Sequence, residues 1–338
     1  MRELLKTEHL SVSFFTKAGE VEAVRDVSLS VEEGEVLAIV GESGCGKSAL
    51  CKSIMKLLPK TAKIKSGKIL ADGIDITDYT QRNMSRLRGD LFSMIFQDPM
   101  TSLNPTMTIG KQIEEAVRIH NKKMPKKQVK KKVLALMQLV EIDEPEVRIS
   151  QYPHEFSGGM RQRAVMAIAL AGNPKILFAD EPTTALDVTI QAQILDVFRR
   201  IQKKLGMATV FISHDLGVVA GVADRVAVMY AGKIVEIGTA EEIFYDPRHP
   251  YTWGLLQSLP ILSRGKEWLP TLPGMPPTLI HPPKGDAFAE RNAYAVRIDY
   301  EKEPPMFQVT DTHYAATWLL DERAPKVKAP IGEQRYGK

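Results

Sequence analysis

Two patterns of apolar and polar residues alternate along this chain. Residues 36–40, 176–179 and 209–213 are almost wholly apolar, which predicts short strands buried on both faces. Residues 109–120 and 126–140 instead space their apolar side chains at helical intervals. In the second of these segments one face carries Val129, Val133, Leu136 and Val140. Strands that alternate with helices indicate a parallel α/β sheet.

Changes in this pattern divide the chain into four parts. The pattern predicts short β runs with turns in residues 1–97 and a helical insert in residues 98–165. It predicts a return to alternating strands and helices in residues 166–249. Residues 250–338 are rich in proline, which disfavours long regular elements. We therefore expect an α/β core with a helical insert and a C-terminal appendage of extended character.

Charge and cysteine content narrow the class of protein. The 45 basic and 41 acidic side chains leave a formal charge of +4, too small and dispersed to indicate nucleic-acid binding. No segment resembles a signal peptide or has the roughly 18 apolar residues that span a bilayer. Cys45 and Cys51 form neither a disulfide framework nor a four-thiolate metal site. We expect a protein of the reducing cytosol.

A cluster of lysines opens the second helical segment. Its members are Lys122, Lys123, Lys126, Lys127, Lys130, Lys131 and Lys132. Such a cluster is typical of the solvated face of an exposed helix. The alternative is contact with anionic lipid headgroups, at about 1 kcal/mol per basic residue, if a membrane partner holds the chain near a bilayer.

Residues 41–48, GESGCGKS, match the phosphate-binding pattern G-x-x-x-x-G-K-[ST] between a predicted strand and a predicted helix. Glycines let backbone N–H groups turn toward phosphate oxygens, and the helix N-terminus adds partial positive charge. Lys47 suits the β and γ phosphates, and Ser48 suits magnesium. The structural alternative is a glycine-rich turn that contains Lys-Ser by chance, in about 1% of chains of this length.

The two cysteines differ in their position relative to this loop. Cys45 lies inside it, near a helix N-terminus, which is expected to favour the thiolate and inactivation by a maleimide, with protection by MgATP. Cys51 lies further along the helix and is expected to be an inert packing residue.

A pair of carboxylates, Asp180 and Glu181, ends the apolar strand at residues 176–179. Because adjacent strand residues face opposite ways, Asp180 can lie toward hydrated magnesium while the turn places Glu181 beside the γ-phosphate and the attacking water. Glu181 therefore suits the general base. Taken alone, the pair is more typical of an acidic strand end that caps the next helix.

Between these two motifs Ser157, Gly158 and Gly159 lead into an apolar helix, residues 164–171, and predict a second anion-binding helix start. One chain that binds one nucleotide has no use for two such starts, so we expect the second to face a nucleotide held by another subunit. A flexible helix entry is the structural alternative.

This order of motifs resembles that of ABC-type ATPases over about the first 250 residues. Phe156 and Met160 stand where the signature motif of the family most often has Leu and Gln, but Ser-Gly-Gly is intact. The resemblance implies that Gln97 contacts magnesium and senses the membrane subunits, that Asp187 is a dimer contact and that His214 is the switch histidine. Taken singly, these would be a loop amide, a helix cap and an ordinary histidine.

The resemblance also implies the ligands and the fold. ATP and magnesium are expected, with Glu181, His214, Gln97 and Lys47 as catalytic residues and Ser48, Gln97 and Asp180 at magnesium. The nucleotide-binding set is Phe14 (chosen over Phe15 to stack on adenine), Gly41, Ser43, Gly44, Cys45, Gly46, Lys47, Ser48, Ala49, Gln97, Asp180, Ser157, Gly158, Gly159 and Asp187. The fold expected is a parallel-sheet nucleotide core (1–97 and 166–249), an antiparallel β subdomain, a helical subdomain (98–165) and an appendage (250–338).

The C-terminal part is similar to the oligopeptide and dipeptide importer branch of the family. The similarity rests on the run from Arg248 to Thr252 and on Leu272, Pro273 and Gly274. It implies an ATPase at the cytoplasmic face of the membrane, paired with a second, homologous ATPase in a heterodimer. Two transmembrane permease subunits and an extracellular peptide-binding protein complete the implied assembly, without nucleic acid. A plain linker is the alternative for this segment.

Many relatives in that branch carry four C-terminal cysteines that resemble iron–sulfur ligands. Asp286, Asn292, Asp299 and Thr317 stand at the corresponding positions here. Iron–sulfur clusters need soft sulfur donors, so no cluster is expected. These side chains are expected instead to bond to the backbone of an irregular segment that aromatic side chains such as Phe288 help to pack. A weak divalent cation site is the alternative.

Two other functions compete with peptide import. A soluble ABC-type ATPase that acts on nucleic acid or ribosomes resembles two tandem cores, whereas this chain has one phosphate loop and one signature motif. An ATP-binding regulator without hydrolysis is opposed by the intact Glu181.

Overall fold

The computed structural model describes residues 2–184, 186–259 and 272–330, and the chain divides into two compact units. The first unit comprises Met1–Leu5, Ser30–Val36 and Leu70–Ile212, and the second comprises Lys6–Leu29, Leu37–Ile69 and Ser213–Lys338. The four-part division that the sequence suggested stays a prediction.

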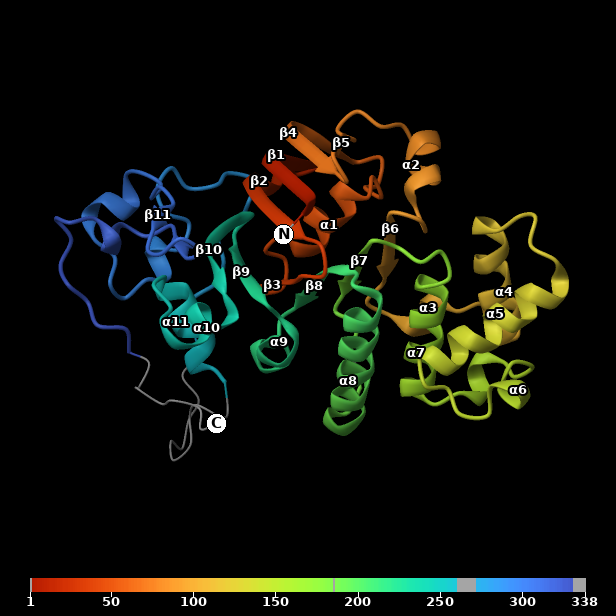
Figure 1. The fold of residues 1–338 in the computed structure, drawn as a ribbon. Coiled ribbons are helices and arrows are strands. Elements are labelled where there is room, and N and C mark those ends of the chain that lie inside the picture. The colour runs from red at the N-terminus through yellow and green to blue at the C-terminus, as the bar shows by residue number, and fades with distance from the viewer. Residues whose placement is uncertain (1, 185, 260–271, 331–338) are drawn as a thin grey trace. The chain divides into compact units, whose positions relative to one another are not determined.

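Figure 1 labels most of the regular elements along the chain. The strands are β1 (Glu3–Thr16), β2 (Gly19–Glu32), β3 (Val36–Val40), β4 (Ala62–Ala71), β5 (Ile74–Asp75), β6 (Phe92–Ile95), β7 (Ile176–Asp180), β8 (Ala208–Ser213), β9 (Arg225–Tyr230), β10 (Lys233–Thr239), β11 (Phe307–Gln308) and β12 (Tyr314–Ala315). The α-helices are α1 (Lys47–Ile54), α2 (Gln81–Leu87), α3 (Pro99–Ser102), α4 (Ile109–His120), α5 (Lys126–Leu139), α6 (Pro145–Arg148), α7 (Gly158–Ala169), α8 (Val188–Leu205), α9 (Leu216–Val222), α10 (Ala240–Tyr245) and α11 (Pro250–Gln257). Short 3₁₀ helices are η1 (Pro153–Glu155), η3 (Ala289–Arg291), η4 (Arg297–Tyr300) and η5 (Trp318–Leu320).

A parallel sheet of β6, β7 and β8 forms the core of the first unit. Phe92 pairs with Ile176, which in turn pairs with Ala208. Every residue of β7 and β8 is buried, which confirms the strands predicted at residues 176–179 and 209–213. Helix α8 packs on this sheet through Phe198, whose ring centroid lies 5.6 Å from that of Phe211.

The second unit contains a mixed sheet. Strand β3 runs parallel to β9, whereas β9, β10, β12 and β11 pair in antiparallel fashion in that order. All five residues of β3 are buried, as the apolar pattern at 36–40 predicted. The chain leaves this buried strand at Val40, where the phosphate loop begins.

The β1 and β2 strands are longer than the sequence predicted. Each extends over 14 residues, whereas short β runs were expected. His9 and Asp26 have φ angles of 51° and 55°, so each strand contains a residue in the left-handed region that interrupts the alternation of apolar and polar positions. The His9 Nδ1 and Asp26 Oδ1 atoms, 2.7 Å apart, pair these irregularities with each other. The sequence pattern therefore breaks where the strand itself continues.

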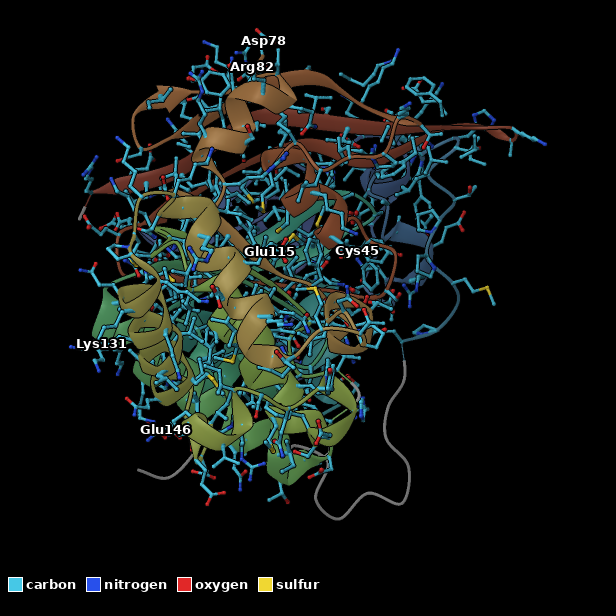
Figure 2. All side chains as sticks on the ribbon, turned by 90° about the vertical axis from the view of Figure 1, so that its right-hand side faces the viewer. Cys45, Asp78, Arg82, Glu115, Lys131 and Glu146 are labelled. Carbon is cyan, nitrogen blue, oxygen red and sulfur yellow. The ribbon has the colours of Figure 1, made fainter. Side chains whose placement is uncertain are left out.

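The two helices predicted at residues 109–120 and 126–140 are present as α4 and α5. Helix α4 has the predicted bounds, and α5 buries Val129, Val133, Leu136 and Met137. The lysines of the cluster are exposed, except for the half-buried Lys132, and Figure 2 shows Lys131 at the outer surface. This exposure is what a solvated helix face requires, while contact with lipid stays untested.

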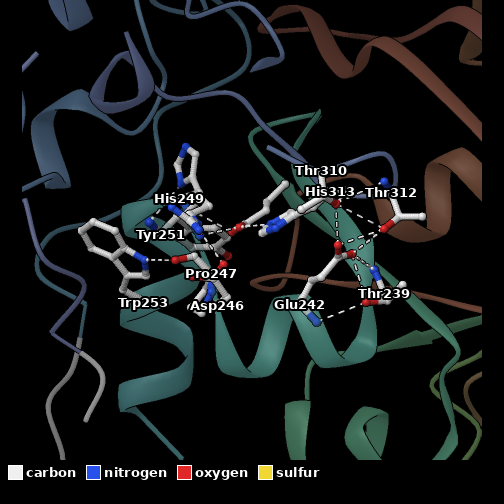
Figure 3. Close-up of polar contacts among 12 residues, drawn as sticks. Thr239, Glu242, Asp246, Pro247, His249, Tyr251, Trp253, Thr310, Thr312 and His313 are labelled. Carbon is white, nitrogen blue, oxygen red and sulfur yellow. Dashed lines mark hydrogen bonds and ion pairs between the residues drawn. The ribbon is translucent and has the colours of Figure 1, made fainter. Parts of the chain in front are cut away.

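The appendage is anchored to β10 and α10 by polar contacts. Glu236, which is fully buried, accepts a hydrogen bond from His313 Nε2 at 2.8 Å, while the Glu242 carboxylate accepts from the hydroxyl groups of Thr310 and Thr312 (Figure 3). Burial opposes ionisation of Glu242, but these donors and Thr239 lower its pKa to about 2. The described part of the appendage, residues 250–259 and 272–330, therefore packs on β10 and α10, although its regular elements are short.

Candidate functional site

The phosphate loop, residues 41–46, connects β3 to α1 by a path that two glycines permit. A Cβ atom on Gly41 would lie 2.1 Å from the Met229 carbonyl oxygen, and one on Gly46 would lie 2.2 Å from that of Ala23. Their φ angles of 150° and 111° also disfavour other residues. Gly44 has no heavy atom within 4 Å of its Cβ position. The loop is thus closely packed at both ends and open at Gly44.

Lys47 is the cation of this loop. Its side chain is nearly buried, and Nζ donates to the carbonyl oxygens of Gly41 at 2.7 Å and Glu42 at 2.9 Å. The ammonium group therefore lies within the loop, at the first turn of an eight-residue helix. An ammonium group beside a helix N-terminus fits an anionic phosphate group.

The structure corrects the expectation for Cys45. Its side chain is buried, and burial raises the pKa of the thiol even though the charge of Lys47 opposes this shift. A raised thiol pKa disfavours the thiolate, so the expected reactivity toward maleimide was wrong in its premise. Cys51 is buried as well, as its predicted packing role requires.

We therefore predict slow alkylation of Cys45 in the folded protein at pH 7. The rate should rise with pH, since the thiolate fraction of a raised-pKa thiol grows about tenfold per pH unit. Mass-spectrometric labelling would compare Cys45 with an exposed reference thiol, Ser85→Cys on α2. Labelling of Cys45 as fast as that of the reference at pH 7 would show that the buried environment is misassigned.

The carboxylate pair ends β7 in the first unit. Asp180 is the last, buried residue of the strand, and Glu181 follows with a φ angle of 48°, which is uncommon for a residue with a side chain. The Glu181 N–H donates to the Ile212 carbonyl of β8 at 3.0 Å. Its Oε2 accepts from Gln97 Nε2 at 2.9 Å and from Thr184 Oγ1 at 3.0 Å. A strained backbone thus orients a carboxylate that two donors hold.

The helix-cap alternative for this pair does not hold. The N-cap of α8 is Asp187, whose side chain accepts from the Ile190 N–H at 3.0 Å. Asp187 therefore does cap a helix, which leaves its predicted dimer contact untested.

The Ser-Gly-Gly turn opens α7. Ser157 is the N-cap, accepts from the Met160 N–H at 3.3 Å and is exposed, as is Gly158. A Cβ atom on Gly159 would lie 2.7 Å from Ile190 Cγ2 of α8, so this glycine permits a close approach of the two helices. The buried Phe156 precedes the turn. An exposed helix start is what contact with a second subunit requires.

The remaining predicted residues lie in the second unit. His214 is exposed directly after β8, and Phe14 is half-buried near the end of β1. Phe15 is 41% exposed, with Lys63 and Lys65 Nζ at 5.8 and 5.4 Å from its ring centroid. The choice of Phe14 for adenine and the other residue roles stay predictions.

Sequence reasoning missed two contacts of these motifs. Thr184 lies three residues after Glu181 and could have been suspected from its spacing in the same turn. The ion pair between Glu42 of the loop and Arg291 joins residues 249 positions apart, and no local pattern predicts it.

The four polar residues at the cysteine positions bond to the backbone. Asp286, Asn292 and Thr317 each accept from the N–H two residues ahead, at 2.9, 2.9 and 3.3 Å, and Asp299 accepts from the Val296 N–H at 2.6 Å. This confirms the hydrogen-bonding role that the sequence predicted. The absence of an iron–sulfur cluster stays a prediction.

Burial gives Asp286 a measurable pH dependence. It raises the pKa of this carboxyl group from 3.8 to about 6, with a smaller contribution from the nearby Asp299 carboxylate. The folded state then binds the proton more tightly than the unfolded state, so stability is lost as pH rises from about 4 to about 6. We compare the free energy of unfolding of Asp286→Asn with that of wild type. The difference should favour the variant more at pH 7 than at pH 4, by at most about 3 kcal/mol.

Thermal unfolding midpoints at both pH values would measure this difference. Asp321→Asn is the control, because Arg323 lowers the pKa of Asp321 to about 2 and the charge state of this carboxyl group therefore changes little between pH 4 and pH 7. If the unfolding midpoint of Asp286→Asn differs from that of wild type by the same amount at both pH values, the raised pKa is contradicted.

Two family descriptions match this chain. Residues 24–184 match "ABC transporter", and residues 235–298 match "Oligopeptide/dipeptide transporter, C-terminal region". The first match includes the phosphate loop, the Ser-Gly-Gly turn and the carboxylate pair. The class defined by these motifs is therefore the ABC ATPase.

Relatives match over nearly the whole chain. The oligopeptide transport ATP-binding protein OppD of Bacillus subtilis (strain 168) is 59% identical over 97% of this chain and 92% of its own length. The dipeptide transport ATP-binding protein DppD of Lactococcus lactis subsp. cremoris (strain MG1363) is 58% identical over 96% and 93%. This chain belongs to the oligopeptide and dipeptide transport ATP-binding proteins of the ABC transporter family.

Solved structures agree on the fold. The ATP-binding cassette MJ0796, in a dimeric post-hydrolysis state with ADP and Pi, matches with a TM-score of 0.63 and 26% identity over 70% of this chain and 99% of its own. The cbiO1 protein of Clostridium perfringens matches with a TM-score of 0.64 and 28% identity over 73% and 92%. Both likenesses confirm the ABC-type fold class. Among the described residues, no helix combines the length and apolar character needed to cross a membrane.

Proposed function

We propose that this chain is the ATP-hydrolysing motor subunit of an importer that takes up oligopeptides. The observation that carries the proposal is the Glu181 carboxylate, held by Gln97 and Thr184 in a chain that resembles peptide transport ATP-binding proteins over nearly its full length. A carboxylate so held is suited to take a proton from the attacking water.

Phosphoryl transfer needs positioning and charge stabilisation more than covalent chemistry. Lys47 would bind the β and γ phosphate oxygens, Glu181 would act as general base and His214 would contact the γ-phosphate. Ser157, Gly158 and Gly159, exposed at the start of α7, would face a nucleotide held by a second subunit. Such a composite site would make hydrolysis depend on dimer closure.

Magnesium fits the side chains proposed for it. Ser48, Gln97 and Asp180 offer a hydroxyl, an amide and a carboxylate oxygen, which are the hard donors that magnesium prefers. When bound, the ion neutralises charge on the phosphate oxygens.

The proposed assembly follows from the family. Two transmembrane permease subunits would carry the peptide, a homologous ATPase would complete a heterodimer, and an extracellular binding protein would deliver the cargo. This chain would then lie at the cytoplasmic face of the membrane as a peripheral subunit. Action on nucleic acid or ribosomes is not favoured, because the relatives are transport proteins.

Recovery of the tagged chain from gently solubilised native membranes tests this assignment. We expect two multi-spanning permeases and a second ATPase to co-purify, and peptide with its binding protein to stimulate ATP hydrolysis. The Lys47→Ala chain should recover the same partners without stimulated hydrolysis. Recovery with ribosomes or nucleic acid in place of permeases would contradict the proposal.

A further inference from the structure

Glu42, the second residue of the phosphate loop, is held through both its backbone and its side chain. Its N–H donates to Tyr251 Oη at 2.8 Å, and its carbonyl oxygen accepts from Lys47 Nζ at 2.9 Å. Its carboxylate accepts two N–H groups of Arg291, at 2.7 and 2.8 Å. Tyr251 and Arg291 lie 209 and 249 positions further along the chain, so the appendage supplies most of these contacts.

Arg291 is itself fixed on several sides. Nε donates to the Pro273 carbonyl oxygen at 2.7 Å, and Nη1 also donates to Tyr230 Oη at 3.2 Å. The guanidinium carbon lies 5.6 Å from the Tyr230 ring centroid and 5.9 Å from that of Phe288. Its side chain is only 5% exposed. A planar guanidinium held this way presents a preorganised fork to a carboxylate.

The segment that carries Arg291 is rigidly built. Asp286 and Asn292 accept backbone N–H groups on either side of η3, where Arg291 is the last residue. Phe288 packs on Tyr230 and Tyr251, with ring centroids 5.3 and 5.4 Å away. The appendage and the phosphate loop are therefore joined through one aromatic cluster. The position of Glu42 depends on this cluster and on Arg291.

We propose that Arg291 is a positioning residue for nucleotide binding, which holds the phosphate loop through Glu42 in the conformation that receives ATP. The inference rests on the proposed ATP site and deepens it. A loop fixed in advance loses less conformational freedom when a ligand binds. If the loop gains the conformational freedom of about one backbone residue, ATP binding must order that residue again, which lowers the affinity about 5- to 30-fold.

Binding of a fluorescent ATP analogue with magnesium, together with hydrogen exchange of the peptide that covers residues 41–46, tests the proposal. Glu42→Gln and Arg291→Met should each weaken binding about 5- to 30-fold and speed exchange of the loop amides. The double variant should lose little more than either single variant, because both remove the same contact. Glu42 has 26% of its side chain exposed, so Glu42→Gln carries the test if Arg291→Met does not fold.

Glu303→Gln is the matched control. It removes the appendage ion pairs with Arg25, at 2.7 Å, and with Lys233, and leaves the ion pair of Glu42 with Arg291 in place. It should keep wild-type affinity and loop exchange. If wild type binds the nucleotide and Glu42→Gln has the same affinity and the same exchange of the loop amides, this inference is overturned and the proposed function is not. If wild type fails to bind the nucleotide, the proposed function falls as well.

Discussion

We expect Glu181→Gln to slow ATP hydrolysis by about 10² to 10⁴-fold, the usual range for loss of a general base, while MgATP binding persists. Glutamine keeps the volume of the side chain and an oxygen that can accept from Gln97 and Thr184, but it cannot take a proton from water. The left-handed backbone at residue 181 should persist, because glutamine is unbranched at Cβ as glutamate is. The expected product is therefore a closed dimer that traps ATP.

Phosphate release and nucleotide retention, measured on the assembled complex, check this result. Glu146→Gln on α6 is a suitable control, since it neutralises an exposed carboxylate elsewhere in the same unit. It should hydrolyse ATP at the wild-type rate. A Glu181→Gln protein with wild-type turnover would show that another group is the base.

We expect Lys47→Ala to weaken MgATP binding by about 10- to 150-fold, the equivalent of one hydrogen bond to a charged group. The ammonium group lies within the loop on the carbonyl oxygens of Gly41 and Glu42, so its removal deletes a positioned cation from the phosphate site. Alanine is a good helix former, which leaves the start of α1 intact. The loss should therefore appear in affinity with little change in stability.

Equilibrium titration with MgATP and a thermal unfolding curve separate these effects. Lys60→Ala removes an exposed lysine outside the loop and should retain wild-type affinity. Equal affinity of Lys47→Ala and Lys60→Ala would contradict the role of the loop in phosphate binding.

Features that depend on neighbours along the chain could be predicted from the sequence. The apolar run at 36–40 forms β3, and helix α4 has the bounds that its periodicity predicted. Both predictions hold because the spacing of apolar residues within an element reflects which of its faces are buried. The phosphate loop was identified because its glycines and lysine lie within one run of eight residues, 41–48. The β1 strand was misjudged because His9, in the left-handed region, breaks the alternation without ending the strand.

The acid site could be predicted only in part. Asp180 and Glu181 are adjacent, so the sequence identified both, and the family resemblance supplied Gln97. The 2.9 Å contact between Gln97 and Glu181, which are 84 positions apart, depends on the parallel pairing of β6 with β7. Periodicity within either strand contains no information on that distance.

The sequence by itself determined which strands are buried, where the phosphate loop begins and which residues end β7, since all of these follow from local order. Tertiary structure alone decided the raised pKa of Cys45, the strained backbone of Glu181 and the ion pair between Arg291 and Glu42. The pKa of a thiol depends on how many atoms exclude water from it, and an ion pair depends on where two distant segments lie. Those atoms come from parts of the chain that only the fold brings together.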